Sequence, residues 1–188
     1  MNRDLIIESD RLLLYTVLPA EYELLEIDRA HPDLWIDRGF SDPNKHFLIG
    51  PDPIKHRLPR VRQHPEWAKY LLRMAVFKNE KIVIGSAGFH HAPDQNGMIE
   101  IGFTVDKPYQ GMGFGQEILH AMWGWVVADP LVKTLRYTVS PNNTISEHII
   151  KKFGFTHNGQ QIDAEDGPED IYEPVSYTHL TLPTIYSV

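Results

Sequence analysis

MIEIGFTVDKPYQGMGFGQEILHAMWGWVV, residues 98–127, is the most informative segment of this chain. Its first eight residues predict a strand, and residues 116–127 predict a helix with a broad apolar face. Between them, glycines recur at positions 111, 113 and 115. Glycine has no Cβ, so backbone N–H groups can converge on one point, and the helix N-terminus adds the positive end of its dipole. The segment therefore predicts a phosphate site that needs no strongly basic pocket.

The spacing of these glycines excludes two common phosphate loops. A dinucleotide-binding fingerprint requires G-x-G-x-x-G, but Gln116 stands where the third glycine is needed. A P-loop ends in Gly-Lys-Ser/Thr, but Gly115 is followed by Gln116 and Glu117. Taken alone, the segment is as compatible with a glycine-rich turn that binds nothing as with a phosphate site.

Further motifs give the segment a context. Residues 110–115 match the Q/R-x-x-G-x-G/A pattern of the GNAT superfamily of N-acetyltransferases, in which this loop cradles the pyrophosphate of coenzyme A. Residues 140–146 and 151–155 resemble the family's N-x-x-S and K-x-G-F signatures. Arg11–Leu14 resembles the opening strand of the branch that contains ribosomal-protein N-acetyltransferases (RimJ/RimL-like). The resemblance extends from residue 5 to 173 and is most specific between residues 98 and 155.

The resemblance implies an α/β (α+β) fold of the GNAT type, with a mixed, mostly antiparallel sheet of six to seven strands flanked by helices. It implies acetyl-CoA as the cosubstrate, no metal, and transfer of the acetyl group to a primary amine by direct attack in a ternary complex. The residues that it assigns to cofactor binding are Phe103, Thr104, Val105, Gln110, Gly111, Met112, Gly113, Phe114, Gly115 and Asn143.

Two catalytic residues are predicted. Glu100 is the candidate general base, directly or through water, because Ile99 and Ile101 point to the opposite face of the strand. The alternative is a structural carboxylate paired with a cation. Ser146 is the general acid that the resemblance suggests, because Ile150 stands where many relatives have Tyr. The alternative is a serine that bonds local backbone groups.

Other candidate residues and elements carry weaker signals. His90 and His91 follow a predicted strand and are kept as reserve bases. The other predicted strands are residues 11–17, 69–78, 82–89, 135–139, 155–162 and 170–175, and the other helices are 19–30 and 144–153. The proline-rich segment 31–66 predicts short helices and loops along one wall of a cleft. Residues 1–174 are expected to form one domain, and residues 175–188 resemble a non-native or disordered tail.

Composition narrows the possible functions. The chain of 188 residues has no cysteine, which excludes disulfides, thiolate zinc sites and a cysteine nucleophile. A net charge of −7 disfavours nucleic-acid binding and weakly favours a cationic acceptor. No apolar run reaches the length of a membrane span, and the acidic N-terminus is unlike a secretory signal, so the predicted location is the cytoplasm.

The expected partner is a small-molecule amine or a peptide N-terminus, with no nucleic acid and no membrane, and the expected assembly is a monomer or homodimer. A different class of function remains open. The chain would then be a non-catalytic sensor that binds acyl-CoA, and the missing Tyr at Ile150 is what favours it.

Overall fold

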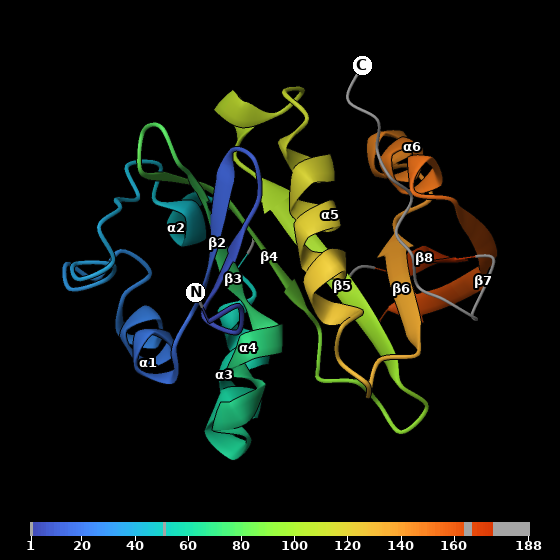
Figure 1. Ribbon diagram of the computed structural model, residues 1–188, viewed down its shortest axis with the longest axis horizontal. Helices are drawn as coiled ribbons and strands as arrows, with labels where there is room; N and C mark the ends of the chain where they lie inside the picture. Colours follow the sequence, from blue (N-terminus) through green and yellow to red (C-terminus); the bar gives the residue numbers. More distant parts are fainter. Residues whose placement is uncertain (1, 51, 164–166, 175–188) are drawn as a thin grey trace.

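The computed structural model describes residues 2–50, 52–163 and 167–174. Their centre is one eight-stranded sheet with the order β1-β2-β3-β4-β5-β6-β8-β7 (Figure 1). All neighbouring strands are antiparallel except β5 and β6, which are parallel. The strands are β1 (Ile6–Glu8), β2 (Leu12–Thr16), β3 (Arg73–Phe77), β4 (Ile82–Phe89), β5 (Met98–Val105), β6 (Thr134–Val139), β7 (Phe155–Asp163) and β8 (Gly167–Pro174).

This architecture confirms the predicted fold class and corrects the strand count. The strand that the sequence did not predict is β1, whose three residues pair with β2 and are too few to show an alternating pattern. The predicted tail at residues 175–188 lies outside the described residues.

Six α-helices flank the sheet within the described part of the chain. They are α1 (Pro19–Ile27), α2 (His46–Ile49), α3 (Ile54–Gln63), α4 (Ala68–Leu71), α5 (Phe114–Val126) and α6 (Thr144–Lys152). Pro59 lies inside α3, which shows that the prolines of this region do not all end helices.

One predicted strand begins too early. Residues 69–71 were expected to open the strand that ends near Lys78, but they belong to α4, which follows a 3₁₀ turn at Pro65–Trp67. The strand begins only at Arg73. A short apolar run such as Tyr70–Leu72 does not discriminate between a strand and a buried helical turn, because both bury consecutive residues here.

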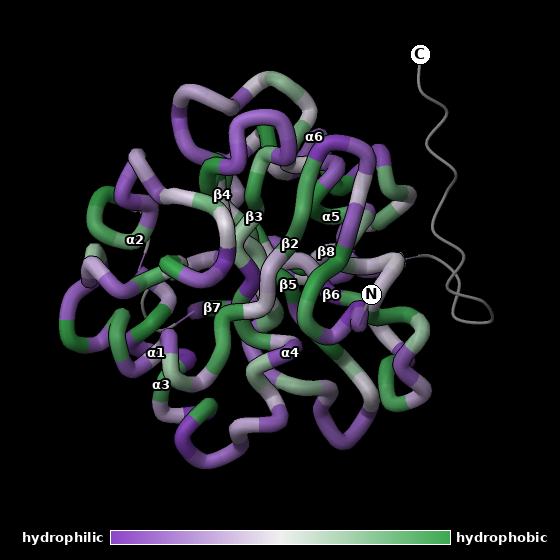
Figure 2. The backbone as a smooth tube through the Cα atoms, turned by 60° about the vertical axis from the view of Figure 1, so that its left-hand side comes forward, coloured by the Kyte–Doolittle hydropathy of each residue, from purple (hydrophilic) through white to green (hydrophobic). Residues whose placement is uncertain are grey.

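The sheet separates two layers of apolar side chains. Along β3, Ala75 packs with the cluster around α5, whereas Met74 and Val76 pack with the cluster around α1 and α3. This alternation follows from the pleat, which sends successive side chains to opposite faces. In Figure 2 the hydrophobic stretches of the central strands run through the middle of the molecule, and hydrophilic stretches gather on turns at its edge. Each face of the sheet therefore has its own core.

The parallel strands β5 and β6 part before they end. Their pairing runs from Met98 opposite Thr134 to Ile101 opposite Tyr137 and stops there. Beyond this point β5 stays paired only with β4, and β6 continues along β8. One edge of β5 from residue 102 to 105 therefore lacks a strand partner in the described structure, and its backbone polar groups are available to a ligand, except the Val105 carbonyl, which accepts from the Gln110 side-chain amide.

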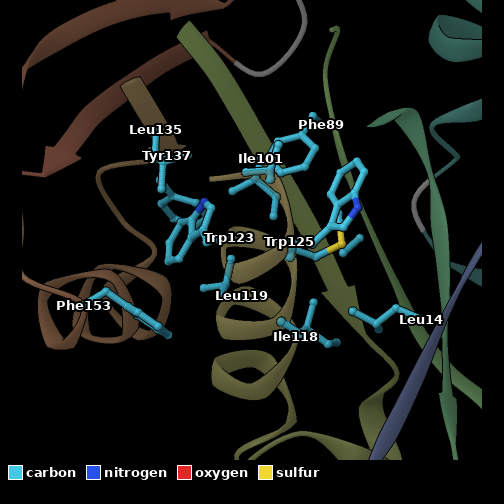
Figure 3. Packing of buried hydrophobic residues seen from close by; sticks show 14 of the residues in the cluster. Leu14, Phe89, Ile101, Ile118, Leu119, Trp123, Trp125, Leu135, Tyr137 and Phe153 are labelled. Carbon is cyan, nitrogen blue, oxygen red and sulfur yellow. The ribbon is translucent and has the colours of Figure 1, made fainter. Parts of the chain in front are cut away.

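Trp123 of α5 provides a test of the packing on this side of the sheet. The side chain is fully buried and stacks on Phe155, with 4.7 Å between the ring centroids. The ring of Phe153 packs edge-on against it, with 5.0 Å between the centroids (Figure 3). We expect Trp123→Ala to lower the free energy of unfolding by about 3–5 kcal/mol, because it removes a large buried ring and leaves a cavity. Urea denaturation measures this loss. Ile27→Ala, at a side chain that is 74% exposed, is the control and should change it by less than about 0.5 kcal/mol.

Two kinds of feature are absent from the described residues. No helix among them combines the length and apolarity needed to cross a bilayer. No group of three or more His, Asp or Glu side chains among them is arranged to hold a metal ion.

Candidate active site

The glycine-rich loop ends in a set of unused backbone donors. Gly111 and Gly113 have φ angles of 75° and 81°, a conformation that favours glycine, and Gly113 is the N-cap of α5. Among the described residues, none of the N–H groups from Gly111 to Gln116 has a hydrogen-bond acceptor. Such donors at the positive end of a helix suit a phosphate group. The loop therefore fits the pyrophosphate of coenzyme A.

An ion pair between distant segments holds this loop in place. The Arg11 guanidinium donates from Nε to Oε2 of Glu117 at 2.7 Å and from Nη1 to the carbonyl of Met112 at 3.0 Å. The hydroxyl of Ser9 and the backbone N–H of Arg11 donate to the other carboxylate oxygen. Burial raises the pKa of Glu117, but these hydrogen bonds outweigh it, so the pKa is lowered and the carboxylate stays charged. No sequence pattern signals a pair 106 residues apart.

A cavity of about 710 Å³ lies beside the loop, between the end of β5 and the first turns of α6. Every residue predicted to bind the cofactor lines it except Met112, whose side chain is 54% exposed. Ser146, the predicted acid, lines it as well. The lining residues with predicted roles are Phe103, Thr104, Val105, Gln110, Gly111, Gly113, Phe114, Gly115, Asn143 and Ser146.

Asn143 and Ser146 also have local structural roles. Asn143 is the N-cap of α6, and its side-chain oxygen accepts the backbone N–H of Ser146 at 3.1 Å. Tyr137 of β6, which the sequence analysis did not identify as a site residue, contacts the Ser146 side chain. Burial raises the pKa of Tyr137, and a hydrogen bond with the Ser146 side chain partly opposes that shift. The serine hydroxyl is therefore linked to a phenol that stays protonated at neutral pH.

Glu100 lies on the face of β5 that is turned away from α5. It is 7% exposed, and its Oε1 accepts the hydroxyl proton of Thr138 at 2.6 Å. Nδ1 of His90 lies 3.3 Å from the same oxygen. Glu100 lines neither large cavity, but His90 lines a second one. His90, predicted from the sequence only as a reserve base, therefore connects Glu100 to the second cavity.

This second cavity, of about 620 Å³, lies on the α3 side of the sheet. Its walls come from α3 and the residues before it, from β4 and β5, and from Asp163 at the end of β7. Phe103 and Thr104 line both cavities. The two spaces therefore meet at the stretch of β5 that β6 has left, so ligands in the two cavities would come together there.

A buried chain of polar groups supports the floor of the second cavity. Ser86 of β4 lies opposite Thr104, and its Oγ is 2.8 Å from Nε2 of His46. Nδ1 of His46 is 2.6 Å from a carboxylate oxygen of Asp106. Nδ1 of His46 can donate to this carboxylate, and Nε2 shares a hydrogen bond with the Ser86 hydroxyl, whose direction depends on the tautomer. This arrangement holds the serine oxygen in one orientation at the cavity wall.

The protonation of His90 can be measured directly. Its pKa is lowered to about 4, first by burial and then by the positive charges of Arg57 and Arg60, with His91 contributing and Asp163 opposing. We expect the His90 imidazole to be neutral at pH 6, when a histidine in water is mostly protonated. Imidazole proton shifts followed by NMR from pH 8 to 4 would give its midpoint, and the His90→Gln variant would assign the signal. A midpoint between 6 and 7 would contradict this environment.

Comparisons with known proteins agree with this geometry. The family model for the acetyltransferase (GNAT) domain matches residues 11–156. An uncharacterized N-acetyltransferase of Bacillus subtilis, YjdG, is 31% identical over 155 residues, which cover 81% of this chain and 90% of that protein. The structure of a putative ribosomal-protein-serine acetyltransferase from Vibrio cholerae superposes with a TM-score of 0.61 at 16% identity, covering 94% of this chain and all of that one.

A third similar structure contains ligands. The acetyltransferase MccE, solved in complex with acetyl-CoA and AMP, superposes with a TM-score of 0.58 at 17% identity, covering 89% of this chain and 94% of that one. At such identities the superpositions establish a shared fold and nothing finer.

Proposed function

Because this chain belongs to the acetyltransferase (GNAT) family, we propose that it transfers the acetyl group of acetyl-CoA to a primary amine held in the α3-side cavity. One observation carries this proposal above the rest. The cavity beside the glycine-rich loop and the cavity beside His90 share only Phe103 and Thr104 among their lining residues. A donor in the first and an acceptor in the second would therefore react at this one stretch of β5.

In this proposal acetyl-CoA supplies the acetyl group as a thioester, and the protein positions it. The free N–H groups of residues 111–116 bind the pyrophosphate, and the unpaired edge of β5 binds the pantetheine arm. The carbonyl of Val105 is already occupied by the side-chain amide of Gln110 at 2.8 Å, which fixes the start of the loop. Backbone N–H groups near Phe103–Val105 would stabilise charge on the thioester oxygen.

The acceptor must lose a proton before its nitrogen can attack. We assign this step to Glu100, with His90 relaying the proton from the cavity, because the two side chains are 3.3 Å apart and only His90 reaches the cavity. As the C–N bond forms, the C–S bond breaks, the nitrogen gives its extra proton to solvent, and the departing thiolate takes a proton from Ser146. Tyr137, hydrogen-bonded to that serine, would replace the serine proton and regain its own from solvent.

Acceptors of two kinds are compatible with this site. The likeness to a putative ribosomal-protein-serine acetyltransferase favours a peptide N-terminus, whereas a cavity of about 620 Å³ also accommodates a small-molecule amine. The sensor alternative predicts acetyl-CoA binding without turnover on any amine.

The test is release of coenzyme A, followed with a thiol-reactive dye over a panel of amines. The panel contains amino acids, polyamines, aminoglycosides and short peptides that begin with Ala, Ser or Met. The protein contributes no background because it has no cysteine. Amine-dependent release supports the enzyme and identifies the acceptor class. Binding of acetyl-CoA by calorimetry, with no release on any amine, would replace the enzyme with the sensor.

A further inference from the structure

The α3 side of the second cavity is rich in positive charge, although the protein as a whole is acidic. Lys55, Arg57 and Arg60 line it, and all three come from one helix. Asp52 and Asp163 line it too, and the Asp52 carboxylate is already paired with Arg29 at 2.9 Å. Neither Arg57 nor Arg60 is paired with a carboxylate among the described residues.

Arg57 is a buried cation without a carboxylate partner among the described residues. It is 8% exposed, and among the described residues its guanidinium makes one hydrogen bond, a long one of 3.4 Å from Nη2 to the carbonyl of Gly88. No described carboxylate lies within ion-pair distance of its guanidinium. Burial lowers the pKa of Arg57 to about 10, against a small opposing effect of Tyr22, so the group is still a cation at neutral pH. Burying a cation without a counter-ion is costly, and an anionic ligand in the cavity would remove that cost.

Arg60 lies one helical turn beyond Arg57 and on the same face of α3. Its Nη1 donates to the carbonyl of His90 at 2.5 Å. Like Arg57, it has no carboxylate partner among the described residues. Two guanidinium groups are thus held against backbone carbonyls, one at Gly88 of β4 and one at His90 just after β4, with donors left over. Guanidinium donors of this kind match carboxylate and phosphate oxygens.

We propose that the acceptor is a small amine that also carries an anionic group, a carboxylate or a phosphate, and that Arg57 and Arg60 bind this group. The inference rests on the proposed acetyl transfer and adds the class of acceptor. Gly88, whose carbonyl Arg57 contacts, is two residues along β4 from Ser86, and Ser86 lies opposite Thr104, where the two cavities meet. The anionic group and the amine of the acceptor would therefore be about 7 Å apart. A spacer of a few bonds between amine and anion spans that distance. The amine end then lies at the level of Ser86 and Thr104, two residues along β5 from Gly102, which the His90 ring approaches, and the anionic end faces the arginines.

A binding measurement tests this without relying on turnover. Inorganic phosphate is titrated into the protein saturated with coenzyme A, so that the loop at residues 111–116 is occupied, and the His90 imidazole signal is followed by NMR. We expect a saturable shift that Arg57→Met weakens at least about tenfold, because a charge-assisted hydrogen bond is lost. Arg62→Met, on the same helix but paired with Glu23 at the surface, is the control and should behave as wild type. No saturable shift in the wild type would overturn the proposal.

Kinetics on matched amines test the same point. β-Alanine is compared with propylamine, and O-phosphoethanolamine with ethanolamine. We expect kcat/KM to be at least about tenfold higher for the anionic member of a pair, and Arg57→Met to remove most of that preference, measured as the ratio of kcat/KM within each pair. The pair with the larger ratio of kcat/KM shows whether the site prefers a carboxylate or a phosphate. Arg60→Met and Arg57→Lys, which keeps the charge but loses the fork, are second variants in case Arg57→Met does not fold.

The outcomes separate the two proposals. Equal rates for charged and neutral amines, with Arg57→Met affecting both alike, would overturn the anionic acceptor and leave the acetyltransferase standing. Phosphate binding that depends on Arg57, without turnover of any amine, would support the anion site and contradict the enzyme.

Discussion

Glu100→Gln is expected to lower kcat at pH 7.5 by at least about 100-fold, the usual lower range for loss of a general base. The amide keeps the size of the side chain and can still meet the Thr138 hydroxyl, but it cannot hold the proton that the ammonium gives up. The affinity for acetyl-CoA should stay within about twofold, because Glu100 does not line the cofactor cavity. Calorimetry for binding and coenzyme A release for turnover measure the two effects.

The pH dependence makes this prediction sharper. An aliphatic amine has a pKa of about 10 and a peptide α-amine one of about 8, so below the pKa of the acceptor most of it is protonated and needs the base. Above it the acceptor is already neutral, and the deficit of Glu100→Gln should narrow as the pH rises from 7 to 10. Glu169→Gln is the matched control, since Glu169 is a neighbouring carboxylate bound to Gln161 at 2.9 Å. If Glu100→Gln has normal turnover, the base lies elsewhere, and His90→Gln is the next variant.

Gly113→Val is expected to weaken acetyl-CoA binding at least about 100-fold, which corresponds to ~2.7 kcal/mol. Gly113 has a φ of 81°, and a β-branched residue strongly resists that conformation. The added Cβ would have room, since its nearest neighbour is Arg11 Nη2 at 3.5 Å, so the effect comes from the backbone and not from a clash. A loop that relaxes to a negative φ no longer directs its N–H groups to one point.

The control for this effect is another glycine of the same conformation. Gly154, after α6, has a φ of 76° and open space around it, and it lines neither cavity. Gly154→Val should cost a similar amount of stability but leave acetyl-CoA binding within about twofold. Calorimetry on both variants, with thermal melts to compare their stability, gives the contrast. Normal binding by Gly113→Val would move the pyrophosphate away from this loop.

Several features of the fold followed from local sequence. The strand, loop and helix of residues 98–127 lie where the pattern predicted them, with α5 starting at Phe114, two residues early. Strong periodicity, glycines and short connections carry this information locally. The alternation of Ile99, Glu100 and Ile101 also placed the carboxylate on the face opposite α5. Local patterns failed where runs were short, as in β1 and at residues 69–71.

The acceptor side of the site could not be predicted in this way. Ser86, His46 and Asp106 come from three segments, and nothing in their local sequence indicates that they touch. The sequence analysis missed the cationic residues of α3 for a different reason. Net charge is a sum over the whole chain, and it favoured a cationic acceptor, whereas the field inside a cavity depends on the few side chains that line it. All of α3 lies within residues 31–66, which had been predicted only as short helices and loops along a cleft wall.

The bond network of Glu117 links the start of the chain to the cofactor loop. Ser9 and Arg11 hold the first turn of α5, and they occupy the turn between β1 and β2. Local unfolding that detaches this hairpin from the sheet also breaks the bonds that hold the loop. By thermodynamic linkage, a ligand that binds only the closed loop must stabilise the hairpin by RT ln(1 + [L]/Kd). Bound acetyl-CoA would thus stabilise the packing of the N-terminal hairpin on the sheet. A chain shortened past Arg11 would lose cofactor affinity without losing any residue that touches the cofactor.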